Sequence, residues 1–133
     1  MPQDNQSGAT ANAFGRSAAE IVAREIGATL EGRTSNKARF DQKIVVIKCA
    51  KLRNNNIGVT FKMQGAVHEI VAAFEVTSGL FEVFTLPINI FIDHQRQSKS
   101  GGEGAHQVGQ VSKAVFLKHG KFIKSVSIPA SAA

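Results

Sequence analysis

Hydrophobic residues cluster or alternate in several distinct patterns between residues 16 and 128 of this chain. The most informative pattern is an unbroken β-branched run, residues 44–47, which lies between Asp41 and Lys48. A short apolar run of this kind is typical of a strand that is buried on both faces. The run therefore predicts a central strand over about residues 43–50, with an acidic residue before it and a lysine near its end.

Three more strands are predicted after this one. Apolar residues alternate with polar or small ones over residues 57–63, which is the period of a half-buried strand, and we expect that strand to pair beside the first. Periodicity alone allows either a helix or a strand over residues 70–76. The glycine-containing turn at residues 77–79 favours a strand, because such a turn between apolar runs is typical of a hairpin. Pro87 ends the partner strand, residues 80–86.

Two short segments have patterns typical of helices. Ser17 and Glu20 have the spacing of a capping box, and apolar residues follow at helical spacing. Gly27 is a natural stop, so a helix is predicted over about residues 18–26. A second helical turn is predicted over residues 88–92.

The remaining segments are predicted to be irregular. Residues 1–15 are small and polar with no period, which predicts a mobile lead-in, and residues 129–133 predict a frayed tail. Residues 94–110 form a long glycine-rich polar loop, which in so small a domain is either functional or disordered. Residues 115–123 predict a tight hairpin with its turn at His119-Gly120.

Length and composition fit one domain. With 133 residues, 43% of them hydrophobic, the chain can bury one modest core. We predict a single α/β domain over residues 16–128, with a mixed sheet of four or five strands and one or two helices. Cys49 is the one cysteine, so no disulfide forms within the chain. No apolar run reaches the length of a membrane span and no signal-peptide pattern is present, which predicts a cytoplasmic protein.

Charge is segregated along the chain and favours an anionic partner. The net charge is +6, and residues 33–62 hold eight Lys or Arg against Asp41 alone. Residues 63–93 hold four acidic residues and no base, and the segment from His94 onward holds six bases against Glu103. Nucleic acid is the commonest partner of a small basic protein. The residues expected to contact DNA are Arg33, Lys37, Arg39, Lys43, Lys51, Arg53, Arg96, Lys99 and Lys113.

The aromatic residues and histidines indicate which ligands are expected, among DNA duplexes, single strands and zinc. The chain has no Trp or Tyr, and its nine Phe lie mostly in apolar patterns, so duplex DNA is favoured over a single strand that would stack on exposed rings. The histidines are scattered without paired ligand spacing, so a zinc site is not expected. They are His68, His94, His106 and His119.

The order of these elements, with Asp41 before the central strand and Lys48 near its end, resembles the PD-(D/E)XK nuclease-like fold of restriction endonucleases. In that family an Asp opens one strand, and an acidic residue, any residue and a Lys close the next. The acids bind magnesium and the lysine orients the attacking water. Asp41 matches the first acid and Lys48 the lysine, whereas Val46 stands where the second acid belongs. The resemblance covers roughly residues 16–92.

The valine at position 46 leaves two functions open, DNA cleavage and DNA binding without cleavage. A single carboxylate rarely anchors magnesium well enough for catalysis. Either another acid replaces the missing one or the domain has lost cleavage. Glu20 on the first helix and Glu31 before the basic segment are the candidates for a replacement, although Glu20 is also explained as the capping-box partner.

Three functions follow as alternatives. The favoured one is a duplex DNA-binding domain that needs no cofactor. The second is a magnesium-dependent DNA endonuclease, with Asp41 on the metal, Lys48 steadying the water and Glu20 as the migrated acid. The third is a protein-interaction module that uses its hairpins to form a homodimer.

Overall fold

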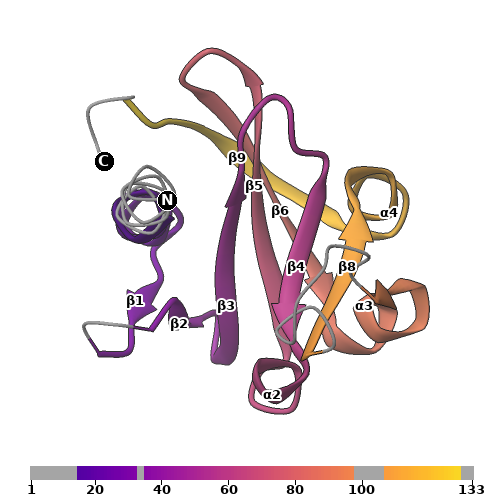
Figure 1. Ribbon diagram of the computed structural model, residues 1–133. Helices are drawn as coiled ribbons and strands as arrows, with labels where there is room; N and C mark the ends of the chain where they lie inside the picture. Colours follow the sequence, from indigo (N-terminus) through magenta and orange to yellow (C-terminus); the bar gives the residue numbers. More distant parts are fainter. Residues whose placement is uncertain (1–14, 33–34, 98–106, 130–133) are drawn as a thin grey trace, which may run out of the picture.

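The computed structural model describes residues 15–32, 35–97 and 107–129. Within these residues the chain forms one α/β domain with two sheets (Figure 1). In chain order the elements are a first helix over residues 15–26, β1 (Thr29–Leu30), β2 (Lys37–Phe40), β3 (Lys43–Ala50), β4 (Asn56–Thr60), α2 (Phe61–Gln64), β5 (Glu69–Thr77), β6 (Leu80–Pro87), α3 (Ile88–His94), β7 (Arg96–Gln97), β8 (Val108–Ser112), α4 (Lys113–His119) and β9 (Lys121–Ser127). The predicted α/β class is confirmed, but the main sheet has six strands instead of four or five.

The six-stranded sheet is mixed. Its strand order is β1-β2-β3-β5-β6-β9, in which β3 and β5 run parallel and the other neighbouring pairs are antiparallel. The second sheet has the antiparallel order β4-β8-β7. A parallel pair needs a long crossover connection, which β4 and α2 supply between β3 and β5.

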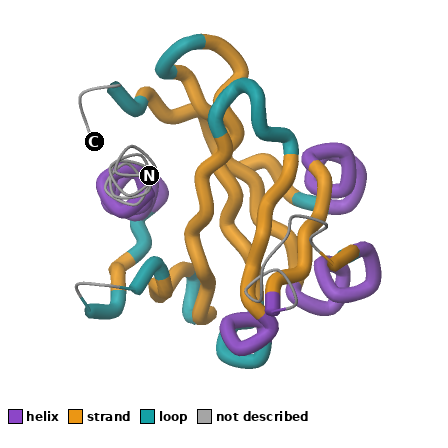
Figure 2. The backbone as a smooth tube through the Cα atoms, viewed as in Figure 1, coloured by secondary structure: helices purple, strands orange, loops and turns teal. Residues whose placement is uncertain are grey.

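The main sheet is covered on both faces, as Figure 2 shows for the first helix on one side and the second sheet with α3 and α4 on the other. Val45 and Ile47 pack into the core on the side of the first helix. Val46 and Ala50 point the opposite way and pack against β4, α3 and α4. Because consecutive residues of β3 are buried on opposite faces, the strand is apolar without alternation.

A tight turn joins β2 to β3. Asp41 and Gln42 have φ values of 52° and 64°, the two left-handed positions of a type I′ hairpin turn. Asp and Asn adopt this conformation more readily than most other residues that carry a side chain. The turn therefore explains an acidic residue at position 41 without any reference to a metal.

The strand predicted over residues 57–63 is shorter and pairs differently. β4 ends at Thr60, whose hydroxyl accepts a hydrogen bond from the backbone N–H of Met63 at 3.1 Å and caps α2. β4 pairs with β8 in the second sheet, so the prediction that it lies beside β3 in one sheet was wrong. The buried amide of Gln64 donates to the carbonyl of Val59 at 3.0 Å and to Oε1 of Gln95 at 2.7 Å, which fixes α2 against this sheet.

The first helix corrects the capping-box prediction. Ser17 lies inside the helix, which already includes Gly15, so Ser17 is not its N-cap residue. Glu20 instead forms an ion pair with Nε of Arg16 at 3.6 Å. The helix ends at residue 26, and Gly27 follows with φ 82°, as predicted.

The C-terminal hairpin prediction was wrong. Residues 113–119 form α4, and the chain then enters β9 through Gly120. A Cβ at Gly120 would lie 2.5 Å from the carbonyl oxygen of Phe116 and 2.7 Å from that of Thr85, so this close approach requires glycine. The predicted loop of residues 94–110 also contains β7 and part of β8.

Several predictions are confirmed. The central strand covers the predicted residues 43–50, and β5, β6 and α3 correspond to the predicted hairpin and helical turn. The predicted lead-in up to residue 14 and the tail from residue 130 lie outside the described residues. No helix in the described part of the chain is long and apolar enough to span a membrane.

Candidate functional site

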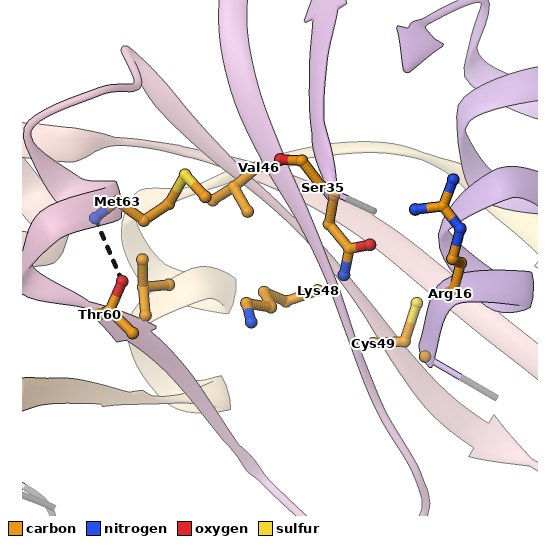
Figure 3. Close-up of a pocket in the computed structure, with 10 residues that line it drawn as sticks. Arg16, Ser35, Val46, Lys48, Cys49, Thr60 and Met63 are labelled. Carbon is orange, nitrogen blue, oxygen red and sulfur yellow. Dashed lines mark hydrogen bonds between the residues drawn. The ribbon is translucent and has the colours of Figure 1, made fainter. Parts of the chain in front are cut away.

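A cleft of about 670 Å³ opens beside the C-terminal half of β3 (Figure 3). The first helix, the segment before β2, and β3, β4 and α2 all contribute to its wall. The lining residues are Gly15, Arg16, Ser35, Asn36, Val46, Lys48, Cys49, Val59, Thr60 and Met63. The cleft therefore gathers side chains from segments that are far apart in the sequence.

The cleft exists because β3 runs beyond its partner β2. The β2–β3 ladder ends where Lys37 faces Val46, and one further hydrogen bond joins the N–H of Ile47 to the carbonyl of Asn36 at 3.0 Å. β3 continues to Ala50 between the first helix and β4. Figure 3 shows Lys48 on the side of Thr60 and Met63, and Arg16 on the first helix across the strand.

Two hydroxyl groups in the cleft are set up to donate. Oγ of Ser35 accepts a hydrogen bond from the N–H of Lys37 at 3.0 Å, and Oγ1 of Thr60 accepts one from the N–H of Met63 at 3.1 Å. Each hydroxyl accepts through its oxygen, so its single proton is free to be donated to a ligand. Both side chains therefore suit a ligand that accepts hydrogen bonds.

Arg16 adds a cation with unused donors. Its Nε pairs with Glu20, while its Nη1 is buried and has no hydrogen-bond partner among the described residues. A buried donor without a partner is costly, and more so when it is charged. An acceptor bound in the cleft would remove that cost.

Lys48 is the second cation. Burial lowers the pKa of Lys48 from 10.5, and the neighbouring Cys49 partly opposes that shift. Burial also raises the pKa of the Cys49 thiol to about 12, against a smaller opposing effect of Lys48. Cys49 is therefore a neutral thiol near pH 7, which agrees with a packing role and not with a nucleophile.

The structure separates the two residues that the family resemblance assigned to catalysis. Asp41 is exposed in the hairpin turn, and Lys48 lies seven residues further along β3. At about 3.3 Å per residue, their Cα atoms are roughly 20 Å apart. Val46 does lie in the cleft beside Lys48, but it is 1% exposed and apolar.

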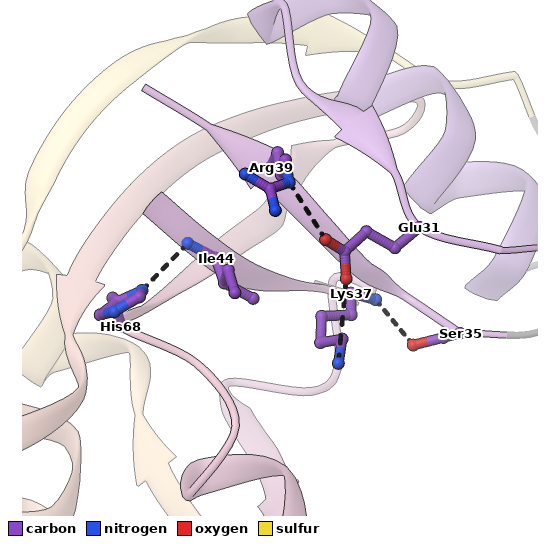
Figure 4. A network of polar contacts seen from close by, with 6 residues as sticks. All are labelled: Glu31, Ser35, Lys37, Arg39, Ile44 and His68. Atoms are coloured by element: carbon purple, nitrogen blue, oxygen red, sulfur yellow. Dashed lines mark hydrogen bonds and ion pairs between the residues drawn. The ribbon is translucent and has the colours of Figure 1, made fainter. Parts of the chain in front are cut away.

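The predicted replacement acids do not fill the gap either. Glu20 is exposed and pairs with Arg16 outside the lining of the cleft. Glu31 forms ion pairs with Lys37 at 3.8 Å and with Arg39 at 3.4 Å (Figure 4). No described residue that lines the cleft is a carboxylate, and the described residues contain no group of three or more His, Cys, Asp or Glu that could hold a metal ion. Magnesium requires oxygen ligands, usually including carboxylates, so this donor set does not fit it.

The basic residues predicted to contact DNA differ in availability. Lys37 and Arg39 share Glu31, and Lys43 pairs with Glu69 at 3.4 Å. Two others also have partners in the described structure: Arg96 donates to Asn56 at 2.9 Å, and Nζ of Lys113 lies 5.7 Å from the centre of the Phe74 ring. Arg53 and Lys51 are exposed just beyond β3, although Lys51 also has an interaction within the described structure. Arg33 and Lys99 lie outside the described residues.

Most of the cleft was missed by the sequence-based prediction. Ser35, Asn36 and Arg16 lie outside every predicted helix and strand, and Thr60 was predicted to lie in the interior of a strand. Each has an ordinary local explanation, so no local signal sets it apart. The register that ends β2 opposite Val46 leaves Ser35 and Asn36 beside the C-terminal half of β3, and the pairing of β4 with β8 places Thr60 on another wall of the cleft.

Comparisons with known proteins give a match among solved structures but none with a family model or a curated protein. Among solved structures, the chain is similar to Hjc, a Holliday junction resolvase from the archaeal hyperthermophile Archaeoglobus fulgidus, with a TM-score of 0.39 and 8% sequence identity. The match covers 84% of this chain and 88% of Hjc. A likeness of this size carries no weight for function, which is inferred below from the cleft itself.

Proposed function

We propose that this domain binds duplex DNA by holding its sugar–phosphate backbone in the cleft beside β3, without cleaving it. The observation that supports the proposal is the donor-rich lining: Arg16, Lys48 and two hydroxyls with free protons, with no carboxylate among the described lining residues. Phosphate oxygens only accept hydrogen bonds, and cations strengthen those bonds. Met63, which is half-buried, gives the cleft an apolar part that suits a sugar ring.

Neighbouring positive charge extends this footprint. Lys51 and Arg53 follow the cleft end of β3, and Lys62 is exposed on α2 next to the cleft residue Met63. Of the residues expected from the sequence, Lys51 and Arg53 are therefore the ones we include in the interface. Contacts of this kind position a protein on DNA without reading its sequence, so binding should depend little on base sequence.

Fluorescence anisotropy with a labelled duplex tests the proposal. We expect Arg16→Ala and Lys48→Met each to weaken binding about tenfold, the effect of losing one charge-assisted hydrogen bond. Lys43→Met is the matched control, because it removes one cation from the other end of the same strand, where Glu69 already pairs with it. Equal losses in Lys43→Met and Lys48→Met would refute the role of the cleft.

The strand preference needs its own comparison. No described lining residue of the cleft is aromatic, which favours a duplex, since single strands usually stack on aromatic rings. Phe61 on α2 is 45% exposed, however, which the sequence pattern did not predict. Tighter binding of a single strand than of a duplex, lost in Phe61→Ala, would replace the duplex with a single-stranded ligand.

The endonuclease alternative is tested in the same preparation. We expect no plasmid nicking by the pure protein with magnesium or manganese. Metal-dependent nicking that Asp41→Ala abolishes would establish the endonuclease instead. The protein-interaction alternative predicts a homodimer in sedimentation and no binding of DNA at low salt.

A further inference from the structure

Two histidines that are distant in the sequence lie together on the surface. His94 is the last residue of α3 and His119 the last residue of α4. Their ring centroids are 4.8 Å apart and the ring planes differ by 38°. The sequence spacing predicted no paired histidines, so this pair is a product of the fold.

The helix ends that carry the pair are held by the core. Phe91 and Phe116 each precede one of the histidines by three residues, and both are fully buried. Their rings meet edge to face with centroids 6.5 Å apart. The close approach of Gly120 to the carbonyl of Thr85 also holds the end of α4 against β6. The two imidazoles are therefore presented by a rigid support.

The orientation of His94 is fixed by a backbone acceptor. Its Nδ1 lies 3.0 Å from the carbonyl oxygen of Ile90. A carbonyl only accepts hydrogen bonds, so Nδ1 carries the proton and the lone pair of the neutral ring is on Nε2. Histidines that bind metals commonly have this arrangement, in which the second nitrogen donates to a backbone carbonyl. His68 differs, because its Nδ1 accepts the N–H of Ile44 at 3.1 Å (Figure 4).

We propose that His94 and His119 together bind one late first-row divalent cation, of the class of Zn²⁺, Ni²⁺ or Cu²⁺. Two imidazole nitrogens about 2.0 Å from a tetrahedral ion place the ring centroids roughly 5 Å apart. The observed centroid separation of 4.8 Å is close to this value. Imidazole suits these metals, whereas magnesium and calcium prefer oxygen ligands. With two protein ligands, the other coordination positions remain open to water or an external group.

Calorimetric titration of the full, tag-free chain with Zn²⁺, in the absence of DNA, tests the site. We expect one ion per chain, with affinity at least tenfold lower in His94→Ala and in His119→Ala. The double variant should lose no more than either single variant, because one ligand is insufficient. His68→Ala is the matched control and should bind Zn²⁺ like the parent. Electron paramagnetic resonance with one equivalent of Cu²⁺ should show two nitrogen ligands in the parent and at most one in each His94 or His119 variant.

Two outcomes would overturn the site. One is unchanged Zn²⁺ affinity in either the His94 or the His119 variant. The other is an equal loss in His68→Ala, which would indicate adventitious binding to separate histidines. Both target side chains are exposed, so thermal melts without metal should match the parent and exclude misfolding. Metal should raise the melting temperature of the parent and not that of the two variants.

Discussion

At its N-terminal end β3 leaves a two-residue turn in which Asp41 is exposed, whereas at its C-terminal end Lys48 lies half-buried among side chains from four other segments. One strand thus has a charged residue near each end, but the surroundings differ. Asp41 meets the backbone demands of a left-handed turn. Lys48 faces a cleft in which the hydroxyls of Ser35 and Thr60 have protons free to donate.

The role of a charged residue at the end of a strand depends on the groups that surround it in the fold. Its sequence spacing from other charged residues does not reveal that role. The cation at the first end, Lys43, is neutralised by Glu69 at 3.4 Å. At the cleft end, Arg16 is likewise paired with Glu20 at 3.6 Å, but Lys48 forms no ion pair with a carboxylate of the described residues. Only the second end therefore offers net positive charge to a ligand.

The largest expected effect is on the free energy of unfolding, when a carboxylate is placed first near the cleft end of β3 and then near its turn end. Val46→Asp puts an acid at a position that is 1% exposed, so we expect a loss of about 3 kcal/mol or more in the free energy of unfolding. Lys48 nearby would offset part of this cost. Gln42→Asp, in the exposed turn, is the control and should change stability by less than about 0.5 kcal/mol.

Urea denaturation of both variants, with and without magnesium, measures this difference. Recovery of Val46→Asp by magnesium would mean that one added carboxylate suffices to build a cation site in the cleft. A Val46→Asp protein as stable as the parent without metal would contradict the burial of that side chain.

The next prediction compares the lysines at the two ends of β3 by the salt dependence of DNA binding. If about six phosphates are neutralised, the logarithm of the DNA-binding constant should fall with a slope near −5 against the logarithm of salt concentration. Lys48→Met should reduce the magnitude of the slope by about one, the loss of one phosphate contact, and Lys43→Met should leave it unchanged. Anisotropy titrations at several salt concentrations give both slopes. A parent slope near zero would remove the electrostatic basis of the proposal.

The two ends also differ in how much of them could be predicted. The limits of β3, the β5–β6 hairpin and the end of the first helix follow from local patterns, namely a β-branched run, a glycine turn and a glycine stop. The turn at Asp41 has a local cause as well, since its dihedral angles suit aspartate. Its interpretation as a metal ligand came from the family motif and not from its surroundings.

The cleft end depends on long-range pairing that no local pattern contains. β4 pairs with β8, which lies about fifty residues later, and this pairing carries Thr60 and Met63 to the far wall of the cleft. The same applies to α4, which was predicted as part of a hairpin because His119-Gly120 is typical of a two-residue turn. In the fold the segment before this dipeptide is helical, and Gly120 lies close to the carbonyls of Phe116 and Thr85.

A smaller effect concerns pH at the cleft end. The ammonium form of Lys48 binds phosphate, so affinity should be full below the pKa of Lys48 and fall as the pH rises through it. Burial lowers this pKa from 10.5, so the loss should begin at a lower pH than for an ordinary lysine. Lys48→Arg keeps its charge at every accessible pH and should remove this part of the pH dependence. Identical pH profiles for the parent and Lys48→Arg would show that Lys48 does not titrate in the free cleft.

The smallest effect is expected at the turn. Asp41→Ala places alanine at φ 52°, a conformation that disfavours a side chain without a local hydrogen bond, and should cost about 0.5–1 kcal/mol of stability. Asp41→Asn tolerates this conformation and should lose little. DNA affinity should not fall in either variant, because each removes a negative charge roughly 20 Å from Lys48. Urea melts and anisotropy measure the two properties separately. A tenfold loss of DNA affinity in both variants, with stability retained in Asp41→Asn, would place the turn in the interface and remove the difference between the two ends of β3.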